Sequence, residues 1–83
     1  MSLSRPGWFA DLTVRWPAVL GPELSDHVEP LGVDAEGRLH VRCTTHPWAT
    51  QVALLSETVT TRINTSLADG ASITGITVTS SRR

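Results

Sequence analysis

The chain has 83 residues, 40% of them hydrophobic and 18% charged, and its formal net charge is -1. This is enough for one small globular domain and too apolar for a disordered segment, while the charge lacks the basic excess that nucleic-acid-binding domains usually show. No apolar run approaches the roughly 18 residues of a membrane span, and the absence of lysine excludes the lysine-containing loop of P-loop ATPases.

The first part of the chain carries a helical pattern that prolines interrupt. Apolar residues recur every four positions, at Trp8, Leu12, Trp16, Leu20 and Leu24. A proline inside a helix costs about 3 kcal/mol, so Pro17 and Pro22 predict a first helix, a break and a short second helix with Pro22 in its first turn. We expect Trp16 in the core. Trp8, near the terminus, is the better candidate for exposure.

A β-hairpin is predicted next. Residues 28–34 form its first strand, with Leu31 and Val33 pointing to one side, and residues 34–37 have the composition of a turn. Residues 38–44 alternate strictly, which is typical of a strand with one buried face. Leu39, Val41 and Cys43 share the apolar face; Arg38, His40, Arg42 and Thr44 share the other.

One long helix and a third strand complete the pattern. Thr44 or Thr45 is expected to cap the helix, with Pro47 in its first turn and Asp69-Gly70 at its end. Its apolar stripe comprises Trp48, Val52, Leu55, Val59, Ile63 and Leu67. Residues 73–79 read as a strand, with Ile76 and Val78 pointing inward.

The predicted order is helix, strand, strand, helix, strand, which indicates an α+β fold. The last helix is long enough to return the chain for a parallel pairing, so we expect a three-stranded mixed sheet with helices packed on one face. We expect residues 1–7 to be an N-terminal extension that is partly a cloning remnant, residues 8–79 a single domain and residues 80–83 a tail. The open face would carry Arg38, His40, Arg42, Thr77 and Thr79.

The order and spacing of several motifs resemble the DciA family over residues 16–78. The opening motif is Trp16, Val19-Leu20-Gly21, Leu24, His27 and Pro30, and the central strand has Gly37, Leu39 and Val41. The later motifs are Trp48-Ala49, Val52 and Leu55, then Ile63-Asn64 and Leu67, then Ile76 and Val78. The resemblance implies a fold similar to a K-homology domain, association with the DnaB-type replicative helicase, loading of that helicase onto DNA, and affinity for single-stranded or forked DNA.

Two other functions stay open at this point. K-homology domains that bind nucleic acid clamp its backbone with a Gly-x-x-Gly loop, but no two of the six glycines here are three positions apart. Any nucleic-acid contact is therefore expected on another surface. One alternative is a K-homology-like module that binds single-stranded RNA or DNA without a helicase role. Another is a homodimer that pairs through a free sheet edge, so the oligomeric state stays open.

Six residues are candidates for binding nucleic acid or a protein partner: four arginines, one histidine and one tryptophan. Arg38, His40 and Arg42 form a stripe on the predicted open face, where arginine would suit phosphate or carboxylate. A solvated sheet face also needs polar residues, which alone explains the alternation. Trp8 could contact a partner. Arg82 and Arg83, in the tail, could touch a DNA backbone.

Neither an enzyme nor a metal or cofactor site is expected. His40-x-x-Cys43-x-x-His46 has ligand-like spacing, but residues three apart on a strand point to opposite faces. Catalytic signatures such as Gly-x-Ser-x-Gly are absent. Cys43 is the only cysteine, so no internal disulfide can form, and a reducing cytoplasm is the expected location.

Overall fold

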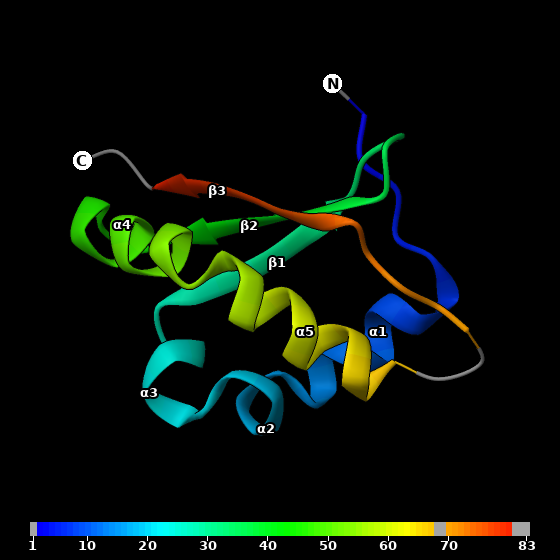
Figure 1. Ribbon diagram of the computed structural model, residues 1–83, viewed down its shortest axis with the longest axis horizontal. Helices are drawn as coiled ribbons and strands as arrows, with labels where there is room; N and C mark the ends of the chain where they lie inside the picture. The colour runs from blue at the N-terminus through cyan, green and yellow to red at the C-terminus, as the bar shows by residue number, and fades with distance from the viewer. Residues whose placement is uncertain (1, 68–69, 81–83) are drawn as a thin grey trace.

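The computed structural model describes residues 2–67 and 70–80, which form a three-stranded sheet with helices on one side (Figure 1). The elements in chain order are α1 (Gly7–Val14), α2 (Trp16–Leu20), α3 (Pro22–Ser25), β1 (Val28–Val33), β2 (Arg38–Cys43), α4 (His46–Leu54), α5 (Ser56–Ser66) and β3 (Gly75–Ser80). The strand order is β1-β2-β3, with β1 antiparallel and β3 parallel to β2. The predicted α+β class and mixed sheet are confirmed, and the arrangement is compatible with a K-homology-like fold.

Three short helices, rather than the expected two, precede the sheet. The additional break lies at Arg15, where φ is -91° and ψ is 4°. Pro17 explains it, because proline has no N–H to donate to the carbonyl four residues earlier and its ring clashes with that carbonyl. The break between α2 and α3 is at Gly21, which has a φ of +93° that side-chain-bearing residues rarely adopt.

The predicted single long helix is wrong, because α4 and α5 meet at a bend centred on Leu55. The φ and ψ of Leu55 are -99° and 15°, outside the helical region. Thr45 caps α4 as expected, with its hydroxyl accepting a hydrogen bond from the Trp48 N–H. The bend turns Leu55 outward while Val52 and Val59 stay buried. The described part of α5 ends at Ser66; Asp69 lies outside the described residues.

The hairpin contains a β-bulge that the sequence pattern did not reveal. Pro30 is aligned with Val41, but Gly32 is aligned with His40, so Leu31 is an extra residue on β1. Val33 is aligned with Leu39 of the apolar face and is buried, whereas Leu31 is the extra residue of the bulge and is half-buried, so the regular alternation that placed both on one side does not hold here.

The core lies between the sheet and the helices. Leu39, Val41 and Cys43 are at most 1% exposed and point toward the helix layer, as predicted, and Ile76 joins them from β3. Trp16 is buried, and its indole N–H donates a 2.8 Å hydrogen bond to the Val28 carbonyl. The core residues are Phe9, Leu12, Trp16, Val19, Leu20, Val28, Val33, Leu39, Val41, Cys43, Ala49, Val52, Val59, Ile63, Ile73 and Ile76.

The two edges of the sheet differ. At the β1 edge, the N–H and C=O of Ser4 exchange hydrogen bonds of 2.9 and 2.8 Å with Val33. Gly32 allows this approach, because a Cβ there would lie 2.8 Å from the Leu3 Cβ. At the other edge, no described residue pairs with β3. Among the described residues, the N-terminal segment thus pairs with one edge, whereas no backbone segment pairs with the other.

Candidate functional site

The face of the sheet opposite the helices carries the predicted basic stripe. Arg38, His40 and Arg42 alternate along β2, and His40 and Arg42 are aligned with Thr77 and Thr79 of β3. The sequence therefore placed these side chains on the right face. It did not reveal that each of them is engaged by a partner within the domain.

Arg42 pairs with Glu29 across the hairpin. Its Nη2 lies 2.7 Å from the Glu29 Oε1, and the two side chains are 48% and 60% exposed. An ion pair this exposed contributes about 0–1 kcal/mol, so it opens at little cost. Arg42 is therefore held only weakly by its carboxylate partner.

His40 lies on the expected face but is only 9% exposed, so it is not a free surface cation. Its Nε2 is 2.8 Å from the Asp34 Oδ2. Asp34 also accepts hydrogen bonds from the amides of Glu36 and Arg38, at 2.9 and 3.0 Å. The His40 hydrogen bond, and next the Arg38 amide, hold the pKa of the Asp34 carboxyl below its ordinary value of 3.8. This cluster organises the hairpin turn.

Arg38 reaches across β3 and tethers it to the hairpin. Its Nε donates to the Thr77 hydroxyl at 3.0 Å and its Nη2 to the Ile76 carbonyl at 2.6 Å. The guanidinium lies above Gly75, where an added Cβ would be 3.1 Å from Nη1. Gly75 therefore leaves room for this crossing. Sequence reasoning missed this role of Gly75 because Gly75 and Arg38 are far apart in the chain.

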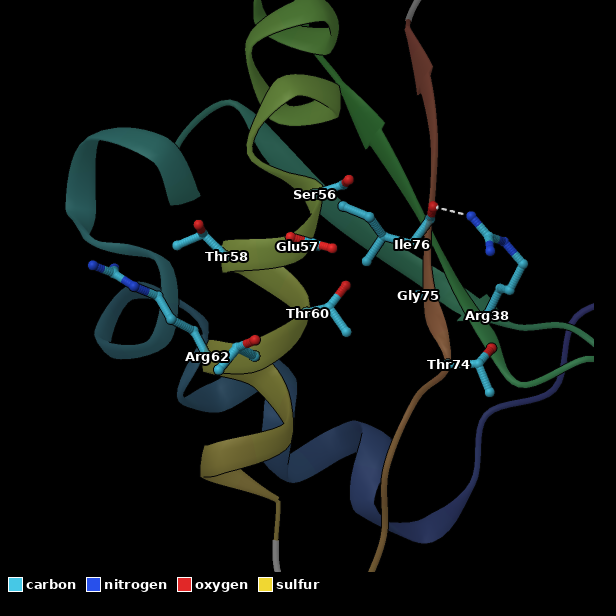
Figure 2. A pocket seen from close by; sticks show the side chains of 10 residues that line it. Arg38, Ser56, Glu57, Thr58, Thr60, Arg62, Thr74, Gly75 and Ile76 are labelled. Atoms are coloured by element: carbon cyan, nitrogen blue, oxygen red, sulfur yellow. Dashed lines mark hydrogen bonds between the residues drawn. The ribbon is translucent and has the colours of Figure 1, made fainter.

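A groove of about 660 Å³ lies between α5 and β3. Figure 2 shows Glu57 directed from α5 toward Ile76, while Arg38 lies on the opposite side of β3. Arg62 also contributes to the wall, but its side chain is directed away from β3. The lining is Arg38, Ser56, Glu57, Thr58, Thr60, Thr61, Arg62, Thr74, Gly75 and Ile76. Hydroxyl groups and opposite charges thus line the groove, and the sequence pattern gave no sign of it.

Trp48 and His27 form a stacked pair at the start of α4. Their ring centroids are 4.3 Å apart and their planes differ by 12°. The His27 Nδ1 lies 3.0 Å from the Thr44 hydroxyl oxygen, which fixes the ring. Trp48, which belongs to the predicted apolar stripe, packs against the core yet stays half-buried. A shallow hollow of about 390 Å³, lined by His27 and Arg42 among others, lies beside the pair.

The remaining predicted site residues are not brought together with the stripe. Trp8 is half-buried, packs against the core and has its ring 6.5 Å from that of Phe9. Arg82 and Arg83 lie outside the described residues.

Residues 2–67 and 70–80 hold no cluster of three or more side chains suited to a metal ion. Cys43 points into the core and His40 to the opposite face, so they do not converge. Burial raises the pKa of the Cys43 thiol above its ordinary value of 9.0, which keeps it protonated. Among these same residues, no helix has the length and apolarity to cross a membrane.

Comparison with known proteins gives a match to the family model "Dna[CI] antecedent, DciA" over residues 1–78. A UPF0232 protein of Streptomyces avermitilis is 35% identical over 74 residues, covering 82% of this chain and 41% of the relative. UPF0232 proteins of Streptomyces coelicolor and Rhodococcus jostii are each 33% identical, covering 83% of this chain and 40% and 38% of the relatives. The chain spans about two fifths of the length of these relatives. The family match, which covers nearly every residue, shows that the chain belongs to the DciA family.

Proposed function

We propose that this domain is a non-enzymatic adaptor in DNA replication, which binds a DnaB-type replicative helicase and promotes its loading onto DNA. The observation that carries the proposal is the DciA family match over residues 1–78. The domain would act in the cytoplasm and would itself bind single-stranded or forked DNA weakly.

The chemistry of the described residues supports an adaptor rather than a catalyst. Nucleophilic catalysis needs a nucleophile, a base and an orienting group in one concave site. Cys43 is buried in the core, and the His40–Asp34 pair faces the other side of the sheet. An adaptor needs only to bind one helicase state more tightly than another, because a ligand shifts an equilibrium by its difference in affinity.

Weak DNA binding fits the charges of the open face. Arg42 and Arg38 are both engaged by partners in the domain, so a phosphate must compete with Glu29 or with Thr77 and the Ile76 carbonyl. With a formal net charge of -1, the long-range attraction to DNA is small.

The test is a titration of the domain against its cognate replicative helicase, followed by fluorescence anisotropy, with and without forked DNA. We expect saturable binding to the helicase and faster helicase loading. The adaptor proposal fails if loading and unwinding are unchanged when the domain is saturating.

A second candidate is a K-homology-like module that binds single-stranded RNA or DNA without a helicase role. The K-homology-like arrangement of the sheet and helices favours it. The helix junction weighs against it, because α4 passes to α5 through Leu55 alone, with no glycine loop to cradle phosphates. Salt separates the two candidates, since a phosphate-driven complex weakens steeply as salt rises. Salt-sensitive binding to nucleic acid, together with no helicase binding, would favour this candidate.

A further inference from the structure

The outer edge of β3 has backbone groups that no described strand pairs with, and their positions follow from the alignment of the strands. Backbone groups of successive strand residues point to opposite sides. The Asp34 N–H donates to the Arg38 carbonyl and the Thr44 N–H to the His27 carbonyl, so even-numbered residues of β2 face β1. Their neighbours, including Leu39 and Val41, therefore face β3.

The alignment of β2 with β3 then fixes which groups of β3 point outward. Leu39 is aligned with Ile76 and Val41 with Val78. In a parallel ladder a residue bonds to the two neighbours of its aligned partner. The backbone groups that Leu39 and Val41 bond to therefore belong to the neighbours of Ile76 and Val78. The N–H and C=O of Ile76 and Val78 themselves face away from β2. The Ile76 carbonyl agrees with this assignment, because it accepts a hydrogen bond from the Arg38 side chain. An added strand would have to displace that guanidinium to bond this carbonyl, whereas it could reach the groups of Val78 directly.

The groove beside this edge provides room for side chains of an added strand. It runs between α5 and the start of β3, with Ser56, Glu57 and Thr60 on the helix side and Thr74 and Ile76 on the strand side (Figure 2). An extended peptide added to a sheet edge gains main-chain hydrogen bonds and places alternate side chains in the adjoining groove.

We propose that the outer edge of β3 and the adjoining groove bind an extended peptide of a partner protein, with a lysine or arginine of that peptide opposite Glu57. Glu57 is exposed and directed into the groove, and among the described residues its carboxylate makes no hydrogen bond or ion pair. A cationic side chain on the peptide complements it.

Glu57 also distinguishes this occupant from the others. A nucleic-acid backbone in the groove would bring phosphates toward this carboxylate, because the two arginines of the lining are directed elsewhere, Arg62 away from β3 and Arg38 on the opposite side of β3. A second copy pairing through its own β3 would bring the sequence Gly-Ile-Thr-Val-Thr-Ser, which has no basic residue to meet Glu57.

Amide hydrogen exchange of the protein alone and with peptide tests the edge assignment. We expect the Thr77 amide to be protected in the free protein and the Val78 amide to exchange rapidly, becoming protected only when peptide is added. Protection of Val78 in dilute free protein would overturn the assignment. Protection that rises with protein concentration alone would identify a second copy as the occupant.

The binding test selects peptides from a displayed library of random heptapeptides and measures the best binder by fluorescence anisotropy. We expect alternating β-branched residues with one fixed lysine or arginine. Glu57→Lys should weaken binding at least about tenfold, as loss and reversal of one charge pair implies. Glu23→Lys makes the same change in the first turn of α3, outside the groove, and should have little effect.

A second pair of variants tests the main-chain contact independently of charge. Val78→Pro removes the outward N–H, whereas Val78→Ala removes a similar amount of packing and keeps it; circular dichroism confirms folding of both. Peptide binding should be lost only in Val78→Pro. The proposal is overturned if the library shows no enrichment or if the two Val78 variants bind the peptide equally. It is also overturned if Glu57→Lys binds a single-stranded oligonucleotide more tightly than wild type does and that oligonucleotide protects the Val78 amide. None of these measurements involves the helicase.

Discussion

At the scale of single residues, the polar face of the sheet is held by pairs that differ in burial. His40 and Asp34 are nearly buried and connect β2 to the hairpin turn, whereas Arg42 and Glu29 form an exposed pair at the other end of the hairpin. The buried pair should therefore affect the stability of the fold, and the exposed pair should affect the binding of DNA.

The stability of the domain should depend on Asp34 in a pH-dependent way. Because the folded state holds the pKa of Asp34 below 3.8, the carboxylate stabilises the fold at pH values above the unfolded pKa. This contribution is lost as the pH falls through the lower, folded pKa. Denaturant unfolding from about pH 6 to about pH 2 should show wild type and Asp34→Asn converging in free energy of unfolding as the pH falls.

Glu36→Gln is the control for this measurement. Glu36 lies in the same turn but contributes only its backbone N–H and C=O to the turn's hydrogen bonds. Its difference from wild type should stay constant with pH. If Asp34→Asn also kept a constant difference, the His40–Asp34 contact would not lower the pKa as described.

Arg42 should contribute to DNA binding more than an arginine with the same exposure elsewhere. Arg42→Gln should weaken binding to forked DNA several-fold and reduce the slope of log affinity against log salt by about 1, as for one lost phosphate contact. Arg15→Gln is the matched control, since Arg15, at the break between α1 and α2, is 47% exposed and pairs with Asp11 at 2.6 Å. Equal losses in both variants, measured by anisotropy over a salt series, would show that the open face has no special role.

At the scale of elements, glycine and proline decide where the N-terminal helices break. Gly21 and Gly7 would both place an added Cβ in open space, but only Gly21 has a positive φ. Gly21→Ala should therefore lower the free energy of unfolding by about 1–3 kcal/mol through backbone strain. Gly7→Ala, in the first turn of α1, should be neutral or stabilising by up to about 1 kcal/mol. Thermal unfolding of the two variants measures the difference; similar midpoints would contradict the strain argument.

At the scale of the whole molecule, sequence periodicity predicted the features that depend on residues close together in the chain. It missed the features that depend on residues far apart in the chain. The mixed sheet, the Thr45 cap and the buried face of β2 follow from alternation and capping rules, and the structure has them. The bend at Leu55 was missed because its stripe of apolar residues continues at helical spacing through the break. The groove was missed because α5 and β3 form it only after the crossover brings them together.

The central position of β2 affects how the chain folds as it is synthesised. The hairpin can form as soon as residue 43 has been synthesised. The other side of β2 pairs with β3, which is synthesised much later: Thr77 follows Arg38 by 39 positions. At about 5–20 residues per second, the ribosome needs roughly 2 to 8 seconds to supply that strand. During this interval the apolar side chains of Leu39 and Val41 border an unfilled edge, so a nascent chain stalled before β3 should be prone to aggregation and a substrate for chaperones.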